Sequence, residues 1–391
     1  MSNQSYSPHD FALTYISNAR FHCRFTLPAT SSRESLTVSY ADVGVVPNPT
    51  NPNPPTILFM PGMFGSRFLG VFMHTVAEKL GVRVLVVDRP GMGHSTDVPL
   101  SQRVAVWLEL VPQILAHLGI EHVALVSHSA GMMYLLNTLF YCRNILHPER
   151  PFVAFLAPWV DPSNSHVTQM QIAQYIPTAA FSLWNRVPKF FLLKAGPVFA
   201  SSGVVASTVS TAVSSSTGHG DGQENSELEK NRQRIERDYG ISRDVQAELD
   251  NLVFKSMFAE NTIGANSEAL QCLRKGPGGA ASWGKAQDYR TFVKEFVDRE
   301  RKWRSEGLYL GARLRIRAYF GETDSMIGKL GQTYVEECWQ GTENGAGFED
   351  VLDFDTRTIP GTDHNSLVQS VVALESVMIH AGGLHGTLTG P

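Results

Sequence analysis

A serine at the end of an apolar run is the residue of this sequence best suited to nucleophilic chemistry. Ser129 lies at the centre of residues 127–131 (SHSAG), which follow the apolar residues 123–126 and lead into a predicted helix at 131–146. A serine on such a tight strand-to-helix turn exposes its hydroxyl at the carboxyl edge of a sheet, and small neighbours keep the turn free of steric crowding. The start of the helix adds unpaired N–H groups and a positive partial charge. We therefore predict that Ser129 is a nucleophile.

Two further residues supply the groups that a serine nucleophile needs. Asp324 ends residues 321–324 (GETD), directly after a predicted strand at 314–320, and His364 lies in the loop after the last predicted strand, at 354–359. A histidine beside the serine can act as a general base, and a carboxylate can hold the imidazole in one tautomer and stabilise the imidazolium. The order serine, acid, histidine along the chain is the one expected for a nucleophile on a strand-to-helix turn. We therefore predict a catalytic triad of Ser129, Asp324 and His364.

A second loop is predicted to bind the negative charge that such a reaction creates. The apolar strand 56–60 (TILFM) runs into residues 61–65 (PGMFG). A glycine-containing turn there leaves the backbone N–H of Met63 free, and the N–H of Ala130 directly follows the nucleophile. Two such donors can hold a developing oxyanion, so Met63 and Ala130 are the predicted oxyanion hole. The residues that bind the rest of a substrate stay unknown at this point.

A glycine- and proline-rich segment at 88–95 (DRPGMGHS) follows the apolar strand 82–87. We interpret it as a structural turn that redirects the chain at the edge of the sheet. The segment lacks the G-x-G-x-x-G pattern and the lysine of phosphate-binding loops, which argues against nucleotide binding. The predicted chemistry calls for no metal ion and no redox cofactor.

After two predicted strands in the first fifty residues, short apolar runs alternate with amphipathic helical patterns from residue 56 to about residue 160. Continuous apolar strands that alternate with helices predict a parallel sheet buried on both faces. The predicted fold class is therefore α/β, with a mostly parallel, doubly wound sheet. The predicted strands of this part are 20–26, 36–40, 56–60, 82–87, 122–126 and 152–156, and its predicted helices are 68–80, 104–118 and 131–146.

The alternation stops after the sixth strand. Residues 162–306 contain mainly helical patterns, interrupted at 201–222 by a tract rich in Ser, Gly and Thr that has the composition of a flexible loop. Residues 1–55 are then predicted to be N-terminal β strands and a linker. Residues 56–161 and 307–391 are predicted to form one α/β core, and residues 162–306 a helical insertion.

Taken together, these motifs resemble the α/β-hydrolase superfamily over residues 56 to about 155 and 314 to about 377. The resemblance implies the α/β-hydrolase fold and identifies the insertion as a helical cap over the active site. Two features depart from the family pattern: Ser127 replaces the first glycine of G-x-S-x-G, and the interval between Asp324 and the histidine is longer than expected, with 341–349 as the extra loop. Asp161 and Glu322 are therefore alternative triad acids. A serine nucleophile argues against haloalkane dehalogenases and epoxide hydrolases, which by this resemblance use a carboxylate.

Composition and charge argue against several other classes of protein. The chain is 43% hydrophobic and 18% charged, and its formal net charge of −4 without basic runs argues against nucleic-acid binding. Residues 1–25 lack the pattern of a secretory signal, and no apolar stretch is long enough to span a membrane. The four cysteines are far apart and form no CxxC or Cys/His cluster, which favours free thiols in a reducing compartment. We therefore expect a cytoplasmic protein.

The predicted function is that of a serine hydrolase that cleaves an ester-like carbonyl in a carboxylester, lactone or thioester. Apolar and aromatic residues between 172 and 199 favour a small hydrophobic substrate, and packing of the insertion on the core explains most of them as well. Alternatives with the same residues are an acyltransferase, a lyase or C–C bond hydrolase, and a small-molecule-binding protein with little or no turnover. The two departures from the family pattern motivate the last alternative. The sequence leaves the oligomeric state open.

Overall fold

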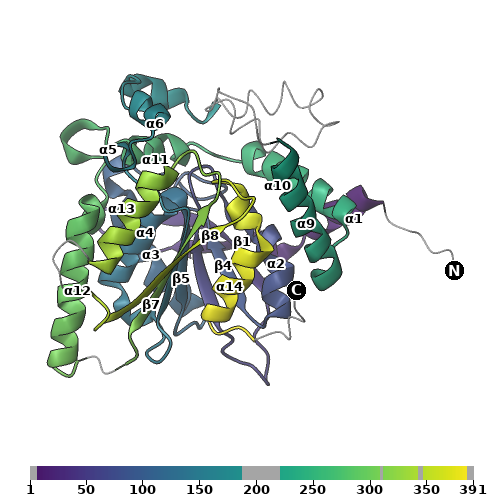
Figure 1. The fold of residues 1–391 in the computed structure, drawn as a ribbon, viewed down its shortest axis with the longest axis horizontal. Helices are drawn as coiled ribbons and strands as arrows, with labels where there is room; N and C mark the ends of the chain where they lie inside the picture. The colour runs from purple at the N-terminus through teal and green to yellow at the C-terminus, as the bar shows by residue number, and fades with distance from the viewer. Residues whose placement is uncertain (1–6, 187–220, 309–310, 342–346, 385–391) are drawn as a thin grey trace.

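A sheet of eight strands runs through the centre of the molecule (Figure 1). The computed structural model describes residues 7–186, 221–308, 311–341 and 347–384. Within these residues the strand order is β1-β2-β4-β3-β5-β6-β7-β8, and β2 alone runs opposite to the others. This confirms the predicted mostly parallel sheet. The strands are β1 (Cys23–Leu27), β2 (Leu36–Gly44), β3 (Thr56–Met60), β4 (Arg83–Val87), β5 (Ala124–His128), β6 (Phe152–Leu156), β7 (Leu314–Gly321) and β8 (Leu352–Ile359).

The four central strands are buried along their whole length. Every residue of β3, β4, β5 and β6 is buried. Successive side chains of a strand point to opposite faces. In β3, accordingly, Leu58 and Met60 belong to the hydrophobic cluster on one face, and Ile57 and Phe59 to the cluster on the other. Because these strands are buried on both faces, their sequences are continuous apolar runs.

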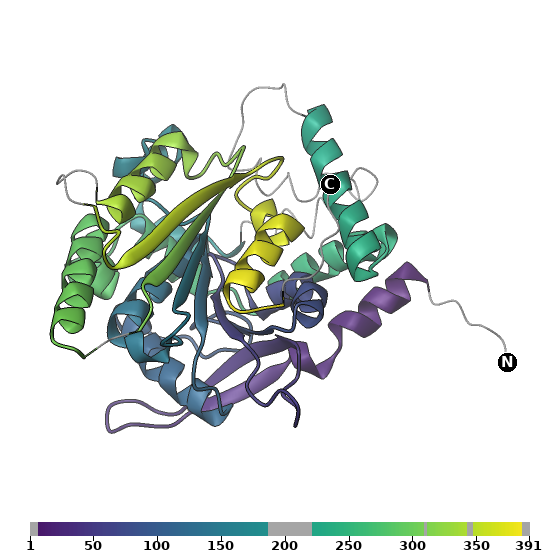
Figure 2. The ribbon, with the colours of Figure 1, turned by 60° about the horizontal axis from the view of Figure 1, so that its bottom comes forward.

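Helices cover both faces of the sheet (Figures 1 and 2). Helices α3, α4, α12 and α13 contribute to one hydrophobic cluster, and α2 and α14 to the other. The doubly wound arrangement predicted from the sequence is therefore confirmed. The bounds are α2 (Gly70–Lys79), α3 (Arg103–His117), α4 (Met132–Tyr141), α12 (Tyr289–Ser305), α13 (Gly328–Gln340) and α14 (Val371–His380), with 3₁₀ helices η2 (Arg67–Leu69), η3 (Leu100–Gln102), η4 (Ser129–Gly131), η5 (Arg143–Ile145) and η10 (Ser366–Gln369).

The chain between β6 and β7 is helical, as predicted. In Figure 1, α5, α6 and α11 lie at the top of the molecule, α9 and α10 at its right, and α12 at its left. The tract at 201–222 that was predicted to be flexible lies outside the described residues, apart from its last two. The bounds are α5 (Pro162–Ser165), α6 (Thr168–Ala173), η6 (Thr178–Leu183), α9 (Asp221–Tyr239), α10 (Arg243–Ala259), α11 (Gly264–Cys272), η7 (Pro277–Gly279) and η8 (Gly284–Gln287).

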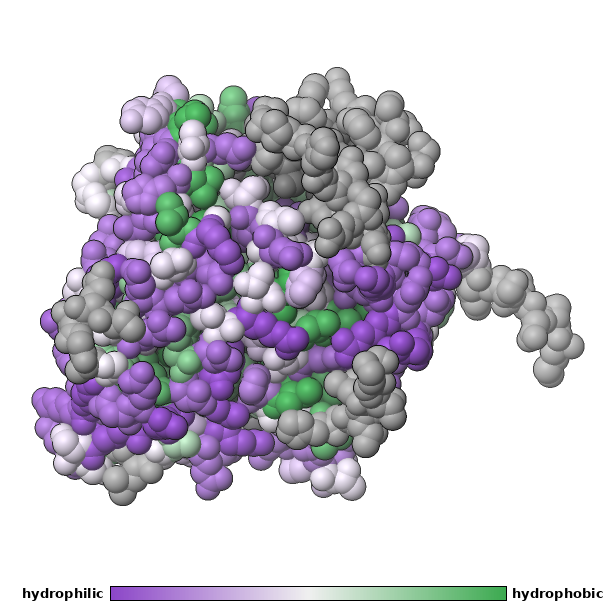
Figure 3. Space-filling model, in the orientation of Figure 1, coloured by the Kyte–Doolittle hydropathy of each residue, from purple (hydrophilic) through white to green (hydrophobic). Residues whose placement is uncertain are grey.

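The face of the molecule drawn in Figure 3 is largely hydrophilic, and hydrophobic residues gather near its top, over α6. Ile172 of α6 and Leu183 of η6 are both exposed. None of the described helices has both the length and the apolar character that crossing a membrane requires. All four cysteines lie among the described residues and are free thiols.

The N-terminal segment differs from the prediction. A helix, α1 (Pro8–Ile16), precedes the strands, where the sequence analysis expected only β structure and a linker. Its signals are local: the side chain of Ser7 accepts a hydrogen bond from the N–H of Asp10, and Pro8 occupies the first turn. The first strand begins at Cys23 rather than at residue 20, because the 3₁₀ helix η1 (Ala19–Phe21) comes before it.

Candidate active site

Ser129 lies at a strained turn between β5 and α4. It is the first residue of η4, and its φ of 48° is in the left-handed region that a serine seldom adopts. Gly131 is required at this turn, because a Cβ there would lie 2.1 Å from the carbonyl oxygen of Met60. Ser127, at the other small position of the pentapeptide, is fully buried in β5 and is paired with Phe155 of β6. Serine thus fits at the first small position, and glycine is needed at the second.

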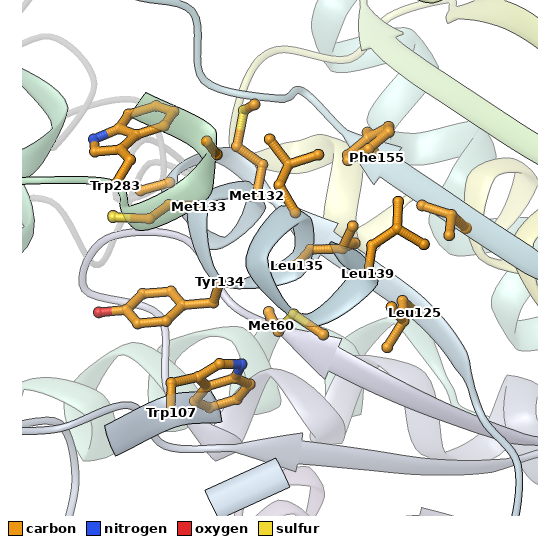
Figure 4. Close-up of a cluster of buried hydrophobic side chains, with 14 of the residues drawn as sticks. Met60, Trp107, Leu125, Met132, Met133, Tyr134, Leu135, Leu139, Phe155 and Trp283 are labelled. Carbon is orange, nitrogen blue, oxygen red and sulfur yellow. The ribbon is translucent and has the colours of Figure 1, made fainter. Parts of the chain in front are cut away.

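Helix α4, which begins directly after this turn, is packed on several sides (Figure 4). Eight of its ten residues are buried. Tyr134 of α4 lies against Trp107 of α3, with ring centroids 5.3 Å apart, and Met133 points towards Trp283 of the insertion. Ser129, in the 3₁₀ turn directly before so well packed a helix, therefore has a rigid support.

The side chains of Ser129, His364 and Asp324 form one chain of hydrogen bonds. Nε2 of His364 lies 2.8 Å from Oγ of Ser129, and Nδ1 of His364 lies 2.9 Å from Oδ2 of Asp324. Because a carboxylate only accepts, Nδ1 carries the imidazole proton and Nε2 accepts from the serine hydroxyl. Ser129, His364 and Asp324 are 5%, 4% and 9% exposed. The structure therefore brings together the three predicted residues, from the loops after β5, β7 and β8.

Asp324 is oriented by the backbone that follows it. Its Oδ1 accepts hydrogen bonds from the N–H groups of Met326 and Ile327, both at 2.9 Å, which leaves Oδ2 for His364. Burial by itself raises the pKa of Asp324, but His364 and the two N–H groups outweigh burial and hold the pKa below its ordinary value of 3.8. The carboxylate is therefore ionised at neutral pH.

The two alternative acids lie elsewhere. Asp161 caps the start of α5, and its Oδ2 lies 3.5 Å from Nε of Arg274. Glu322 accepts a hydrogen bond from the backbone in the loop after β8. The long interval between Asp324 and His364 contains α13 and β8, and residues 342–346 of the extra loop expected at 341–349 lie outside the described residues. The carboxylate in contact with the histidine is thus that of Asp324.

The loop after β3 lies against the nucleophile. A Cβ on Gly62 would lie 3.0 Å from Cβ of Ser129, so the close approach depends on the missing side chain. Phe64 turns the chain with a φ of 64°. Among the described residues none accepts a hydrogen bond from the Met63 N–H. Ala130 is the second residue of η4, and the first N–H groups of a helix have no partner within it. Both predicted oxyanion donors therefore belong to segments that adjoin Ser129.

The family model described as "Alpha/beta hydrolase family" matches residues 57–254, just over half of the chain. The chain belongs to the alpha/beta hydrolase family. The match includes Ser129 and the loop that carries Met63, and it confirms the resemblance seen in the sequence.

Solved structures of similar architecture share little sequence with this alpha/beta hydrolase family member. A thermophilic esterase from Thermogutta terrifontis is 12% identical, with a TM-score of 0.44 over 91% of this chain and 96% of that one. A bromoperoxidase from Bacillus anthracis is 11% identical, with a TM-score of 0.49 over 92% and 99%. An enol-lactonase from Burkholderia xenovorans LB400 is 11% identical, with a TM-score of 0.47 over 88% and 96%. No curated protein sequence matches the chain.

The contact made by His128, the residue before Ser129 in this alpha/beta hydrolase family member, was not predicted from the sequence. Its ring is buried, and Nε2 lies 2.8 Å from the backbone carbonyl oxygen of His364. Burial, and after it the neighbouring His364, lower the pKa of His128 to about 3, so the ring is neutral near pH 7. The neutral ring donates from Nε2 and holds the loop that carries His364. The signal was the place of the histidine at the end of a buried strand, where a polar ring needs a partner.

The turn after β4 was interpreted from the sequence as a change of chain direction, and its buried charges were not predicted. Asp88 and Arg89, at its start, are fully buried. Asp88 accepts from the backbone N–H of Arg67 at 2.6 Å and from its guanidinium at 2.9 Å, and the same guanidinium reaches Glu260 at 2.6 Å. Gly93 closes the turn over the carboxylate, since a Cβ there would lie 2.1 Å from Oδ2 of Asp88. The turn therefore anchors the end of α10 to the core.

Two cavities of the described surface lie apart from the Ser129 site. One lies where α2, α9 and α10 meet, and the other where α5, α12 and α13 meet. Neither is lined by Ser129, His364 or Met63. Within the described residues, no three His, Cys, Asp or Glu side chains are grouped as metal ligands would be.

Proposed function

We propose that this chain is a serine hydrolase that cleaves an ester-like carbonyl through an acyl-enzyme on Ser129. The observation that carries the proposal is the geometry of His364, 2.8 Å from the Ser129 hydroxyl and 2.9 Å from the Asp324 carboxylate. A nucleophile within hydrogen-bond reach of a base, and a base oriented by a third group, are the parts that acyl transfer requires. Membership of the alpha/beta hydrolase family supports the same reaction class.

The proposed reaction has two half-reactions. His364 takes the hydroxyl proton as Oγ of Ser129 bonds to the carbonyl carbon, and Asp324 stabilises the imidazolium that forms. His364 then gives the proton to the leaving alcohol or thiol as its bond to the carbonyl carbon breaks. In the second half-reaction His364 deprotonates a water molecule, which attacks the acyl-enzyme. The carboxylic acid leaves and the Ser129 hydroxyl is restored.

The oxyanion of each tetrahedral intermediate is proposed to accept hydrogen bonds from the N–H groups of Met63 and Ala130. Losing one such donor typically lowers turnover by about 100- to 1,000-fold. The strained φ of Ser129 supports the assignment of Ser129 as the nucleophile, because a strain of roughly 1–3 kcal/mol persists mainly where function needs it.

The proposed substrate is small and hydrophobic, and the insertion 162–306 is proposed to act as the cap of the core formed by 56–161 and 307–391. Phe64, next to Met63, packs against Phe258 of α10 with ring centroids 5.7 Å apart. The insertion thus supplies an aromatic side chain beside the oxyanion loop. Sites lined mainly by apolar side chains favour apolar ligands.

A binding protein without turnover is less well supported. Its two motivations were Ser127 and the long interval between acid and histidine. Ser127 is buried within β5, and Asp324 lies 2.9 Å from His364 in spite of the long interval between them. Esterase, thioesterase, lactonase and acyltransferase activities use the same groups, and analysis of products with and without an added alcohol separates them.

The test combines turnover with active-site labelling of the full chain. Hydrolysis of p-nitrophenyl esters from acetate to octanoate is measured, and a fluorophosphonate probe is reacted and located by mass spectrometry. Ser129→Ala should abolish both signals. Ser165→Ala is the matched control, because Ser165 is 3% exposed and its hydroxyl has no partner among the described residues. It should keep both signals.

Labelling at a serine other than Ser129 would contradict the proposed nucleophile. Turnover that persists in Ser129→Ala would contradict the acyl-enzyme. A protein that binds the esters, releases no nitrophenol and takes up no probe would instead be a binding protein of this family.

A further inference from the structure

A carboxylate from the insertion is buried beside the loop that carries Met63. Glu268 of α11 is 0% exposed. Its Oε1 lies 2.6 Å from Nε of Arg89, and its Oε2 lies 3.0 Å from Nη2 of the same residue. The guanidinium of Arg103 and the hydroxyl of Tyr134 each lie 3.3 Å from Oε1. Buried charges need such pairing, so Arg89 depends on Glu268 for its neutralisation.

The same guanidinium also holds the oxyanion loop. Nη2 of Arg89 donates to the carbonyl oxygen of Gly62 at 2.7 Å and to that of Gly65 at 3.3 Å. These carbonyls flank Met63 on both sides along the chain. Gly62 is in turn pressed against Ser129, so a shift of the loop changes the distance between the Met63 N–H and the nucleophile.

Helix α11 is docked on the core through its backbone as well. The N–H of Gly264 donates to the carbonyl of Gly91 at 2.9 Å, and the N–H of Gly93 donates to the carbonyl of Asn261 at 2.8 Å. A Cβ on Gly264 would lie 2.3 Å from the carbonyl oxygen of Pro90. The segment that carries Glu268 is therefore in direct backbone contact with the turn that carries Arg89.

We propose that Glu268 is a positioning residue for the oxyanion hole. Glu268 fixes the Arg89 guanidinium, which fixes the carbonyls of Gly62 and Gly65 so that the Met63 N–H faces the oxyanion. The inference rests on the proposed function, and it makes this part of the insertion necessary for turnover and not only for covering the site.

A purely structural role for Glu268 predicts a different result, and the chain offers a matched control. Glu300 of α12 is also 0% exposed and also pairs with an arginine, since its carboxylate lies 3.1 Å from Nε and 3.2 Å from Nη2 of Arg143. Arg143 follows the end of α4, whereas Ser129 precedes its start. Glu300 therefore shares the burial and pairing of Glu268 and lies at the opposite edge of the sheet.

The experiment compares Glu268→Gln and Glu300→Gln in the full chain. The measurements are the melting temperature, kcat and KM for p-nitrophenyl butyrate, and the second-order rate of fluorophosphonate labelling at Ser129. The inhibition constant of a trifluoromethyl ketone is also measured, because its adduct with Ser129 carries an oxyanion. Both variants should melt at lower temperature than the wild type.

Only Glu268→Gln should lose activity. We expect kcat and the labelling rate to fall by about 10- to 100-fold with KM nearly unchanged, which is part of the loss seen when an oxyanion donor is removed. The inhibition constant should rise in proportion to the loss of kcat/KM, because both report the tetrahedral state. Equal kcat and labelling rates in Glu268→Gln and Glu300→Gln would overturn the inference.

A second variant covers the case in which Glu268→Gln does not fold. Arg89→Lys keeps a cation next to Glu268 and removes Nη2, the nitrogen that donates to the carbonyls of Gly62 and Gly65. It should show the same loss of kcat and of inhibitor affinity. Wild-type rates in this variant would overturn the inference while leaving Ser129 as the nucleophile. A wild-type protein that is never labelled at Ser129 would overturn the proposed function, and this inference with it.

Discussion

The loops after β4 and β5 hold equivalent places in the sheet and different kinds of groups. Both strands lie next to β3, run parallel to it and are buried throughout. The loop after β5 carries Ser129 at a strained φ of 48°, with its hydroxyl within 2.8 Å of His364. The loop after β4 turns its charged side chains, Asp88 and Arg89, into the protein, where they meet Arg67 and Glu268.

The difference shows that equivalent positions in one sheet can carry either a strained backbone with a neutral hydroxyl or a buried cluster of charges. After β5 the backbone itself stores strain and presents a neutral hydroxyl. After β4 the backbone turn encloses charges that are stable only when partners from distant segments neutralise them. Changes after β5 should therefore affect the rate before they affect stability. Changes after β4 should affect stability first, with Arg89 as the residue that connects this loop to the loop of Met63, which adjoins Ser129.

The largest effect is expected on the reacting side. His364→Ala should lower kcat/KM by about 10,000-fold or more, which corresponds to roughly 5 kcal/mol of transition-state stabilisation, while the melting temperature changes little. Ester hydrolysis and thermal unfolding are the two measurements. His380→Ala is the control, because this half-buried histidine ends α14 and packs on Phe152 at the start of β6. Comparable activity in the two variants would remove His364 from the proposed mechanism.

The next effect is expected on the anchoring side. Asp88→Asn leaves the buried Arg67 guanidinium with one charged partner, Glu260, and should lower the free energy of unfolding by about 3 kcal/mol. Unfolding in guanidinium chloride measures the loss, and kcat per folded molecule should stay close to that of the wild type. A variant of normal stability and low kcat would reverse the proposed division between the two loops.

A pH-dependent effect of intermediate size is expected at His128. Its pKa of about 3 in the folded protein is below the ordinary 6.5, so between these values the unfolded chain binds a proton that the folded protein does not. The free energy of unfolding is therefore at its full value above pH 6.5, and protonation of His128 in the unfolded chain lowers it as the pH falls towards 3. Between pH 7 and 5 the wild type should lose about 2 kcal/mol more stability than His128→Gln, which does not titrate there. Parallel stability curves for the two proteins would mean that His128 is not held neutral.

The smallest effect is expected where charges are exposed. Arg243 of α10 pairs with Glu229 and Glu236 of α9, and all three side chains are more than two-fifths exposed. Exposed ion pairs contribute little, because water and salt screen them. Arg243→Ala should leave the melting temperature and the ester hydrolysis rate unchanged within experimental error. A clear drop in melting temperature would show that charges in the insertion contribute even without burial.

The local part of the site was predictable from the sequence. Ser129 directly follows a buried strand, and Asp324 and His364 lie in the loops after β7 and β8. Parallel strands that alternate with helices bring such loops to one edge of a sheet. The same reasoning predicted eight strands near the positions observed. Helix α1 was also predictable, since Ser7 and Pro8 are ordinary start signals, but the polar segment was interpreted as a lead-in to the strands. The catalytic roles of these residues stay predictions until they are tested.

Contacts between distant charged residues were decided only by the tertiary structure. Arg89 and Glu268 are 179 residues apart, and neither lies in a pattern that points to the other. The choice of Asp324 over Asp161 and Glu322 likewise depended on which carboxylate the folded loops bring within 2.9 Å of His364. The apolar pattern of a helix or strand is visible in a sequence because the pattern repeats along the whole element. A buried ion pair is a single contact without a repeat, so only the packed structure determines which charges meet.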